Sequence, residues 1–378
     1  MVNRERILEE FFRLVQIDSP SMHEREIADY LKQKMTSMGL EVYEDDAGDS
    51  MGNISGKPTG NLIAKLKGSL PDAPVLLLSA HMDTVEPGRG VKPVVKNDAI
   101  YSDGSTILGS DDKAGIVAIL EAVNVLLEEK VPHGDLELLF TVAEECGLKG
   151  VKNLDNKRLQ AKLGFVLDCD GSVGTIITKA PAQYRISASI IGKAAHAGIR
   201  PEEGVNAIFV ASTAIAKMKL GRIDAETTAN IGVISGGKAT NIIPELVNIE
   251  GETRSIDLEK LEVQTKLMVD ILEQVAKEMG AQSKVEKELL YPRLKLEEAN
   301  QAVDIAVKAA QAIGQKPALV STGGGSDANI LNGLAIPTVN LGIGMCKVHS
   351  TEEYITIDNL VLNAQYVLEI IKTAALGN

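Results

Sequence analysis

The chain has 378 residues, of which 44% are hydrophobic and 24% are charged, and its formal net charge is −13. This length exceeds what one hydrophobic core usually supports, so we expect two domains. The acidic balance, without a cluster of Lys and Arg, argues against nucleic-acid binding, and the lack of an apolar run of about 18 residues argues against a membrane span.

The first part of the chain alternates predicted helices with predicted strands. Apolar positions recur with helical spacing over residues 4–17, a charged and amphipathic pattern that differs from a signal peptide. Strand-like runs follow at 61–67, 74–80, 135–142 and 163–167, and an apolar helix is predicted at 112–129. This alternation predicts a mostly parallel sheet with helices on both faces.

The middle of the chain has a different pattern. Its strand-like and helical runs follow the order βαββαβ, which is typical of a ferredoxin-like unit. The strands are predicted at 182–192, 228–234, 246–254 and 284–290, and the helices at 203–220 and 258–279, the second with Asp257 as its N-cap. We therefore predict an inserted α+β domain over residues 181–291.

The outer pattern resumes after this insertion. Helices are predicted at 297–313 and 357–375, and strands at 317–321 and 337–342. Residues 1–180 and 292–378 are therefore predicted to form one discontinuous α/β domain.

Acids and histidines gather at the ends of the predicted strands. In an open α/β sheet, ligands and metals bind beyond the carboxyl ends of the strands, so these side chains are expected to converge. Two imidazoles and five carboxylates suit two divalent metals bridged by a carboxylate, with one acid left to move protons. The set consists of His81, Asp83, Asp111, Glu144, Glu145, Asp168 and His349, and all of them follow a strand except Asp111, which opens a helix.

The spacing within this set indicates separate tasks. Residues two apart in an extended segment point the same way, so Asp83 is expected to accept the second ring N–H of His81. Glu144 and Glu145 end an apolar strand, where burying two carboxylates is costly unless a metal offsets their charge. Because consecutive side chains diverge, one glutamate can bind metal while the other acts as general base.

Some of these motifs also have a simpler interpretation. Asp111 and Asp112 could form a helix N-cap, and the segment 168–171 could be a turn. Of the remaining histidines, His23 and His133 are expected in solvent-facing loops.

The three cysteines offer a rival hypothesis. Cys146, Cys169 and Cys346 each lie within a few residues of a proposed ligand, and they could bind zinc or act as nucleophiles. The chain has no Cys-x-x-Cys spacing, so we interpret them as small buried packing residues. An odd number of cysteines in a large chain suits a reducing compartment better than a disulfide framework, so the expected location is the cytoplasm.

Together these residues resemble the di-zinc exopeptidase family that contains peptidase T, carboxypeptidase G and aminoacylase. The segment Gly-Ser-Asp-Asp-Lys-Ala-Gly, from Gly109 to Gly115, is especially similar to the peptidase T version of the bridging-aspartate motif. The resemblance covers essentially the whole chain. It implies that Asp111 bridges the two metals and that Asp83 orients His81.

The same resemblance assigns the other residues of the set. It implies that His81 and Asp168 bind one zinc ion and that Glu145 and His349 bind the other. Glu144 is then the general base.

The resemblance also implies that the inserted domain is a lid and dimerisation domain, so a homodimer is expected. His196, in Gly-Lys-Ala-Ala-His-Ala-Gly, is similar to a histidine that reaches a partner subunit's active site. Asn241 and Arg254 match positions that hold the carboxylate end of the substrate. The segment after His349 lacks the basic residue that tripeptidases of the peptidase T type carry, so strict tripeptide specificity is not implied.

The expected function is a metal-dependent exopeptidase for short peptides, specifically an aminopeptidase of the peptidase T type. A metal-bridged water would attack the peptide bond, with Glu144 as general base. Zinc is the expected metal, while cobalt and manganese suit similar ligands. Two alternatives stay open: a deacylase or carboxypeptidase that acts on N-acyl amino acids with the same metals, and a non-catalytic protein that binds metal or peptide.

Overall fold

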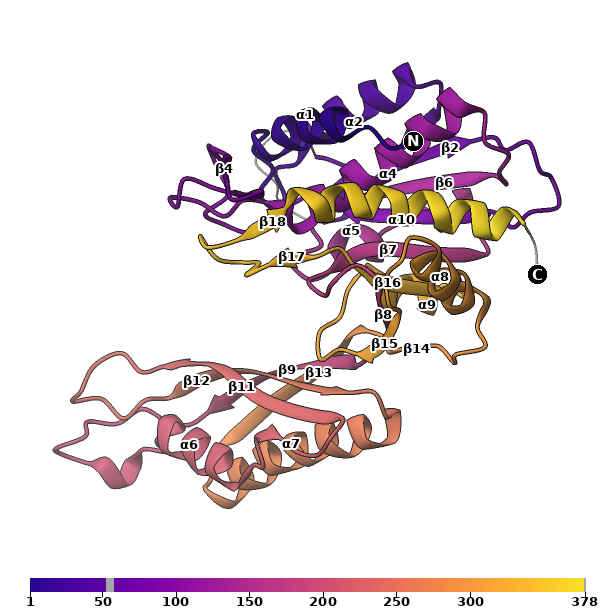
Figure 1. Cartoon of the computed structure of the whole chain (residues 1–378). Coiled ribbons are helices and arrows are strands. Elements are labelled where there is room, and N and C mark those ends of the chain that lie inside the picture. Colours follow the sequence, from indigo (N-terminus) through magenta and orange to yellow (C-terminus); the bar gives the residue numbers. More distant parts are fainter. Residues whose placement is uncertain (52–57, 377–378) are drawn as a thin grey trace. The chain divides into compact units, whose positions relative to one another are not determined.

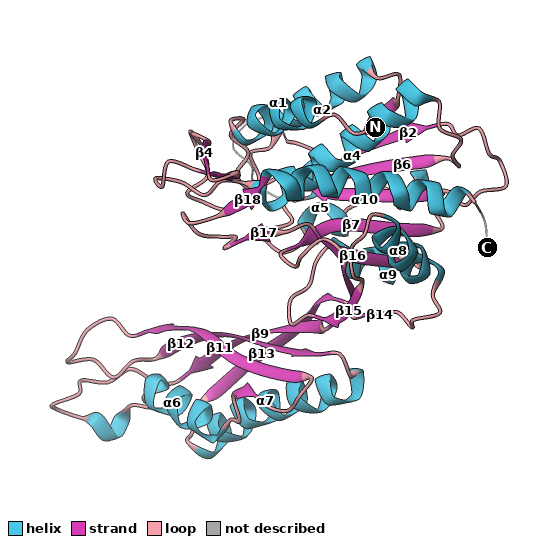
Figure 2. Cartoon of the chain, in the orientation of Figure 1, coloured by secondary structure: helices cyan, strands magenta, loops and turns pink. Residues whose placement is uncertain are grey.

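The computed structural model describes residues 1–51 and 58–376. The chain forms two compact units, and Figures 1 and 2 show the helices and strands of each. Unit 1 comprises Met1–Thr178, Leu296–Ser321 and Ser326–Asn378, and unit 2 comprises Lys179–Lys295 and Thr322–Gly325. Among the described residues, no helix is both long and apolar enough to cross a membrane.

A large sheet forms the centre of unit 1. Its strands are β1 (Glu41–Glu44), β2 (Leu62–Leu66), β3 (Leu76–His81), β6 (Leu136–Thr141), β7 (Leu163–Cys169), β8 (Thr175–Ala180), β15 (Ala318–Ser321) and β16 (Thr338–Gly342), together with the short β14 (Leu294–Lys295) at one edge. The neighbouring strands β6, β3, β7 and β16 are parallel, while β1, β2 and β8 join the sheet in antiparallel pairs. Every residue of β3 and β6 is buried, as expected when helices cover both faces.

Helices surround this sheet, and one of them belongs to the core. They are α1 (Arg4–Val15), α2 (Arg25–Ser37), α3 (Ala47–Ser50), α4 (Ser110–Glu129), α5 (Lys149–Lys152), α8 (Gln301–Ala312), α9 (Asp327–Gly333) and α10 (Ile357–Ala375), with a short 3-10 helix at Asn156–Arg158. Nearly all of α4 is buried, because it packs against β3, β7, α1 and α10. A helix that is apolar on all sides is typical of a core position.

A second, smaller antiparallel sheet in unit 1 was not predicted from the sequence. It consists of β4 (Val94–Lys96), β5 (Ala99–Tyr101), β17 (Met345–Cys346) and β18 (Tyr354–Thr356), in the order β17-β18-β5-β4. Strands of two or three residues are too short to show the period-two alternation by which strands are recognised. The hairpin of β17 and β18 carries a loop over residues 347–353.

Unit 2 is a single antiparallel sheet with two helices packed on it (Figure 1). Its elements are β9 (Ala182–Ile191), a 3-10 turn (Pro201–Glu203), α6 (Ala207–Lys217), β10 (Gly221–Arg222), β11 (Thr227–Gly236), β12 (Leu246–Ser255), α7 (Leu258–Glu278), β13 (Gln282–Tyr291) and β14 (Leu294–Lys295). The sheet order is β10-β11-β12-β9-β13, and β14 pairs with the end of β8. Apart from the short β10, the chain follows the predicted βαββαβ order, and Asp257 caps α7 as expected. The predicted fold class is confirmed.

Two minor predictions about the burial of side chains were wrong. His133 is 7% exposed rather than solvent-facing, because its ring Nδ1 lies 2.7 Å from the Gly134 carbonyl and its own carbonyl accepts the N–H of Leu70 at 3.0 Å, so the loop folds back on itself. The three cysteines are half-buried rather than buried: Cys169 and Cys346 are the last residues of β7 and β17, and Cys146 lies in the loop that follows β6.

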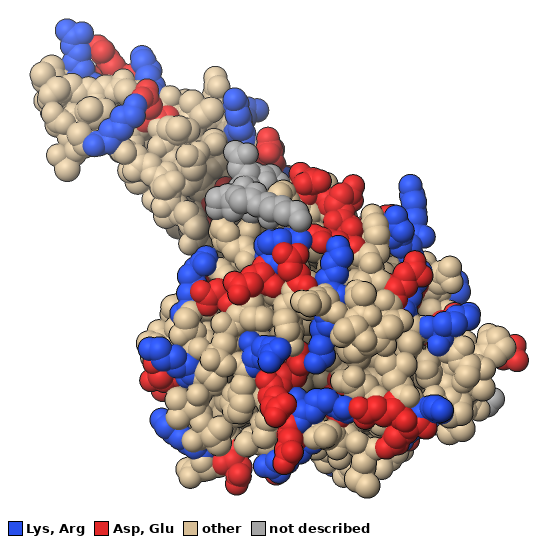
Figure 3. Space-filling view, turned by 90° about the horizontal axis from the view of Figure 1, so that it is seen from above, with Lys and Arg blue, Asp and Glu red and all other residues tan. Residues whose placement is uncertain are grey.

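Charged side chains are mixed on the molecular surface. Figure 3 shows Lys and Arg interspersed with Asp and Glu over the face that it draws. On this face the acidic excess is therefore spread out rather than gathered in one area.

Candidate metal centre

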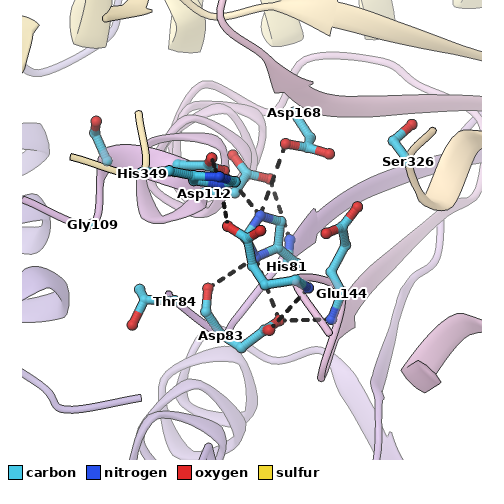
Figure 4. A network of polar contacts seen from close by, with 12 residues as sticks. His81, Asp83, Thr84, Gly109, Asp112, Glu144, Asp168, Ser326 and His349 are labelled. Atoms are coloured by element: carbon cyan, nitrogen blue, oxygen red, sulfur yellow. Dashed lines mark hydrogen bonds and ion pairs between the residues drawn. The ribbon is translucent and has the colours of Figure 1, made fainter. Parts of the chain in front are cut away.

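The carboxyl ends of three neighbouring parallel strands supply most of the predicted site. β6, β3 and β7 lie side by side, so their last residues meet at one edge of the sheet. His81 is the last residue of β3, Asp168 is the last but one of β7, and Glu144 and Glu145 follow β6. Figure 4 shows His81, Glu144 and Asp168 grouped at this edge.

Asp111 lies between the two histidines. Its Oδ1 is 3.0 Å from Nε2 of His81, and its Oδ2 is 3.2 Å from Nε2 of His349. Nε2 of His349 is also 2.8 Å from Oε1 of Glu145, and Nε2 of His81 is 3.8 Å from Oδ1 of Asp168. The structure therefore brings the five predicted ligands into one network, with one oxygen of Asp111 directed to each histidine.

The spacing of these atoms is compatible with metal ions bound among them. Zinc bonds to nitrogen and oxygen are about 2.0–2.2 Å long, so two ligands on one tetrahedral ion lie about 3.4 Å apart. The separations in the network, from 2.8 to 3.8 Å, span that distance. Two groups of ligand atoms each lie within 4.8 Å of one another: His81 with Asp111 and Glu145, and His81 with Asp112 and Asp168. Imidazole nitrogen and carboxylate oxygen suit zinc and several related divalent ions.

Crowded carboxylates give this site a strong negative potential. Burial raises the pKa of Asp168 and of Glu144 well above the usual range, and neighbouring carboxylates raise both further. Burial acts in the same direction on Asp111, but hydrogen bonds from His349 and His81 outweigh it and hold its pKa below the ordinary value. Hydrogen bonding to Asp111 is the largest of the effects that raise the pKa of His349 to about 10. Divalent cations among these groups would offset the repulsion between the carboxylates.

Asp83 holds the backbone of the two glutamates. We predicted that its carboxylate accepts the second ring N–H of His81, but Nδ1 of His81 is closer to the Asp83 backbone carbonyl, at 2.9 Å, than to its Oδ1, at 3.5 Å. The reason is that β3 ends at His81, so residues 81 and 83 do not share one extended segment. The carboxylate also accepts the N–H groups of Glu144 at 2.9 Å and Glu145 at 3.2 Å, and the hydroxyl of Ser21 at 2.6 Å.

Glu24 holds the residue before these two glutamates, a role that the sequence analysis missed. Its Oε1 accepts the N–H of Ala143 at 3.0 Å, so three consecutive backbone N–H groups, 143 to 145, end on carboxylates. Ala143 has a left-handed backbone with a φ of 51°, which residues other than glycine seldom adopt. Glu24 is 1% exposed, and burial raises its pKa to about 7. Glu24 lies just before α2, at a position where a helix cap is expected, so its place in the sequence did not indicate this role.

Two more buried acids lie close to the network. Asp112 accepts the backbone N–H of His81 through Oδ2 at 3.2 Å, and its buried Oδ1 has no partner among the described residues. Asp327 accepts the hydroxyl of Thr141 at 2.6 Å, and burial raises its pKa to about 6. The adjacent pair of aspartates was a signal for Asp112, but Asp111 was favoured as the bridge, and no role in holding His81 was predicted for Asp112. Asp327 does not follow a strand and gave no comparable signal.

In unit 2, the structure brings His196 and Asn241 together. Ala197 donates its N–H to the Asn241 carbonyl at 3.0 Å, and Ile243 donates to the Ala195 carbonyl at 2.9 Å. The His196 side chain is exposed, and its Nδ1 accepts the N–H of Gly198 at 3.2 Å. These two predicted residues therefore lie on adjacent segments beside the start of β12.

Arg254 lies near the other end of β12. Arg254 pairs in the sheet with Gln183. It lies eight residues after Leu246 on β12, which corresponds to about 26 Å at the usual rise per residue. Its Nε and Nη2 donate to the two carboxylate oxygens of Glu252 at 2.9 and 3.0 Å, and its Nη1 donates to the Gly323 carbonyl at 3.3 Å. Within one unit 2, Arg254 is thus not brought together with His196 and Asn241.

The comparison with known protein families agrees with this geometry. Residues 77–373 match Peptidase family M20/M25/M40. The chain belongs to this family of peptidases. The resemblance identified from the sequence is therefore confirmed, and the protein is an enzyme, a metallopeptidase.

Several relatives cover the whole chain. Uncharacterized protein YqjE of Bacillus subtilis (strain 168) is 50% identical over 375 residues, which is 99% of this chain and 100% of that protein. The crystal structure of aminopeptidase PepT from Bacillus cereus ATCC 10987 is 47% identical, with a TM-score of 0.91 and 99% of both chains covered. That of a tripeptidase from Staphylococcus aureus is 44% identical, with a TM-score of 0.94 and 100% of both chains covered.

Proposed function

We propose that this metallopeptidase is an aminopeptidase of the peptidase T type, which acts on short peptides with a free amino end. The observation that carries this proposal is the position of Asp111, whose two oxygens lie 3.0 Å from His81 and 3.2 Å from His349. A carboxylate placed in this way can bridge two metal ions. The identity of 47% to an aminopeptidase and of 44% to a tripeptidase supports the substrate class.

Two divalent ions would be held by this set of residues. His81 and Asp168 would bind one ion, Glu145 and His349 would bind the other, and Asp111 would be shared. When bound, the ions would supply Lewis acidity at the scissile carbonyl and lower the pKa of water. We propose zinc, because imidazole and carboxylate ligands at this spacing suit it, with cobalt or manganese as substitutes.

Glu144 is the proposed general base. It would take a proton from the attacking water and deliver it to the leaving amine nitrogen. Burial, with the nearby Asp168, raises the pKa of Glu144, which favours the protonated form that it must adopt between these two transfers. Asp83 accepts the Glu144 N–H at 2.9 Å and so supports the backbone from which the base extends.

Substrate recognition is assigned to the inserted domain, residues 181–291, as a lid and dimerisation domain beside a catalytic domain of residues 1–180 and 292–378. Arg254 and Asn241 would hold the carboxylate end of the peptide, and His196 would stabilise the developing oxyanion. The distance of about 26 Å along β12 favours a role for His196 and Asn241 in the site of a second subunit, since one copy cannot present them together with Arg254.

The edge of the unit 2 sheet supports the proposed homodimer. Among the described strands, β10 pairs with β11 only at Thr228 and Ala229, so the rest of β11 has β12 on one side alone. Val233 and Ile234 on this edge are 54% and 49% exposed, and Phe209 on α6 is 63% exposed. Unpaired strand edges and exposed apolar side chains are typical of surfaces that associate.

The proposed location is the cytoplasm. All three cysteines are free thiols, and each is half-buried. Free thiols persist most readily in a reducing compartment.

A hydrolysis panel tests the proposed function. Dipeptides and tripeptides with free amino ends would be compared with the same peptides after N-acetylation, while bound metal is measured in parallel. We expect cleavage of the free-amine peptides and none of the acetylated ones. Cleavage of only the acetylated substrates would favour the deacylase or carboxypeptidase alternative, and metal-loaded protein without any cleavage would favour a binding protein.

A further inference from the structure

A buried carboxylate outside the predicted site, Glu353, binds the loop that carries Asp111. Its side chain is 1% exposed. Its Oε2 accepts the N–H groups of Leu108 and Gly109, both at 2.8 Å. Its Oε1 accepts the hydroxyl of Ser110 at 2.6 Å and the N–H of Asp111 at 3.1 Å. Four donors from one short segment therefore converge on a single side chain more than 240 residues away in sequence.

The loop needs such a partner because its backbone departs from a regular helix start. Gly109 has a left-handed φ of 77°, and Asp111 has a φ of −82° and a ψ of 99°. A helix start leaves its first N–H groups without partners inside the helix, and a local side chain usually caps them. Here Ser110 donates instead of accepting, and Gly109 has no side chain. An ionised carboxylate accepts hydrogen bonds without donating any, so Glu353 matches all four donors.

Glu353 also belongs to the turn that carries His349. It lies four residues after His349, and its own N–H donates to the Ser350 carbonyl at 3.1 Å. The Ser350 hydroxyl in turn donates to the Lys347 carbonyl at 2.7 Å. The imidazole of His349 and the carboxylate of Glu353 thus extend from one hydrogen-bonded turn between β17 and β18. Asp111 is in contact with both, through its side chain and its backbone N–H respectively.

The other predicted ligands have independent supports. His81 ends the buried strand β3, and its ring contacts the Asp83 carbonyl at 2.9 Å. Asp168 lies within β7, and its N–H donates to Oδ1 of Asn340 at 3.0 Å. Glu353 takes part in neither of these contacts.

We infer that Glu353 is a positioning residue which locks the Asp111 loop to the His349 turn, and that it sets the affinity for the metal held by Asp111, Glu145 and His349. This inference rests on the proposed two-metal function. The metal held by His81 and Asp168 depends on Glu353 less, because strands β3 and β7 fix these two ligands and only the shared Asp111 is held by Glu353.

Stepwise metal titration of the full chain tests this assignment. In Glu353→Gln, one carboxylate oxygen becomes an NH₂ group that faces donors, so the lock is disrupted with little change in volume. The metal-free variant and wild type would be titrated with Zn²⁺ by calorimetry, with metal content measured after gel filtration. We expect wild type to bind two ions. In the variant the first ion should bind within a few-fold of wild type, and the second about 10- to 100-fold more weakly.

Excess metal distinguishes weakened metal binding from a purely structural defect, because added metal would restore activity only in the first case. Peptide hydrolysis by Glu353→Gln should recover as Zn²⁺ in the assay is raised, with an unchanged KM at saturation. The milder variant Ser110→Ala removes one of the four donors, so it should weaken the second ion in the same direction by a smaller factor. If Glu353→Gln does not fold, Ser110→Ala carries the test.

A matched control separates this role from the general cost of altering a buried glutamate. Glu137 is 2% exposed, accepts the N–H groups of Gln160 and Ala161 at 2.9 and 3.0 Å, and lies near the opposite end of the sheet, at the start of β6. Glu137→Gln should lower the melting temperature and leave both metal affinities unchanged.

Several results would overturn the inference. Normal binding of both ions by Glu353→Gln, or equal weakening of both ions, would show that Glu353 does not set the affinity of one ion. The proposed two-metal function would be unaffected by that result. The same selective loss in Glu137→Gln would show a general effect of destabilisation. If wild type binds fewer than two ions, the proposed function fails and the inference fails with it.

Discussion

The two units present their candidate functional residues in different ways. In unit 1 the ligands and the proposed base lie on or beside buried strands, and carboxylates such as Asp83 and Glu24 fix the backbone around them. In unit 2, His196 is exposed and lies beside the start of β12. Arg254 lies near the other end of this strand, about 26 Å along it from Leu246. The proposed chemistry is thus preorganised within one unit, whereas the proposed substrate recognition would require groups that one copy of unit 2 does not bring together.

The largest effect is expected from removing the shared carboxylate. Asp111→Ala should reduce metal content from two ions to one or none and lower peptide hydrolysis by several orders of magnitude, because both ions lose a ligand. Metal analysis of the purified variant and kcat/KM on a dipeptide check this outcome. Asp170→Ala is a suitable control, since Asp170 is an exposed carboxylate two residues beyond Asp168. Retention of both ions by Asp111→Ala would show that Asp111 does not bridge them.

Loss of the base should separate metal binding from catalysis. We expect Glu144→Ala to keep both ions and to lose about 10²- to 10⁴-fold in kcat, the usual contribution of general acid–base catalysis. Metal content and steady-state kinetics on the same sample provide the measurement. Activity close to that of wild type would show that another group moves the proton.

The same contrast explains how much the sequence could predict. His81, Glu144 and Asp168 were found because parallel strands bring their carboxyl ends to one edge, a rule that converts position in sequence into proximity. His349 was placed with them because it follows a predicted strand, and Asp111 because it opens a helix, while the family resemblance assigned their roles as ligands. The fold class followed from the alternation of helical and strand periodicity.

Residues that act on backbone N–H groups could not be predicted in this way. Glu24 and Glu353 each accept hydrogen bonds from segments more than 100 residues away, and no local pattern records such a contact. The preference of the His81 ring for the Asp83 carbonyl also depends on where β3 ends. The short strands of the small sheet were missed because they show no periodicity.

Unit 2 provides the next test, in which two inactive variants are mixed. His196→Ala should lose about 10²-fold in kcat, as expected for removal of one oxyanion donor, while both ions remain bound. If His196 acts in a partner's site, mixed dimers with Glu144→Ala contain one complete site. Recovery of up to about a quarter of wild-type activity is then expected for random pairing. Failure to recover, in a sample shown to exchange subunits, would place His196 in the site of its own chain.

A smaller effect is expected for Arg254→Lys. Lysine cannot pair with Glu252 through two parallel bonds while also presenting a third donor, so binding of a substrate carboxylate should weaken. We predict a KM about tenfold higher for free-acid peptides, with little change for the same peptides amidated at the carboxyl end. Arg185→Lys, an exposed arginine on β9, should leave both KM values unchanged. An equal rise for acid and amide substrates would contradict a carboxylate-binding role.

The smallest effect concerns stability rather than activity. Burial raises the pKa of Glu24 from its ordinary 4.5 to about 7, so between these values the folded state holds a proton that the unfolded state has lost. This group therefore stabilises the fold less as the pH rises through that window, by at most about 3 kcal/mol. In the metal-free protein, Glu24→Gln should reduce the fall in melting temperature between pH 5 and pH 8. Equal falls in variant and wild type would show that Glu24 titrates normally.

Anomalous diffraction from crystals grown with zinc tests directly whether Asp111 bridges two metal ions. The proposed two-metal bridge predicts two anomalous peaks about 3.5–4 Å apart, one beside His81 and the other beside His349, with one oxygen of Asp111 bound to each. A single peak, or two peaks of which Asp111 contacts only one, would contradict it.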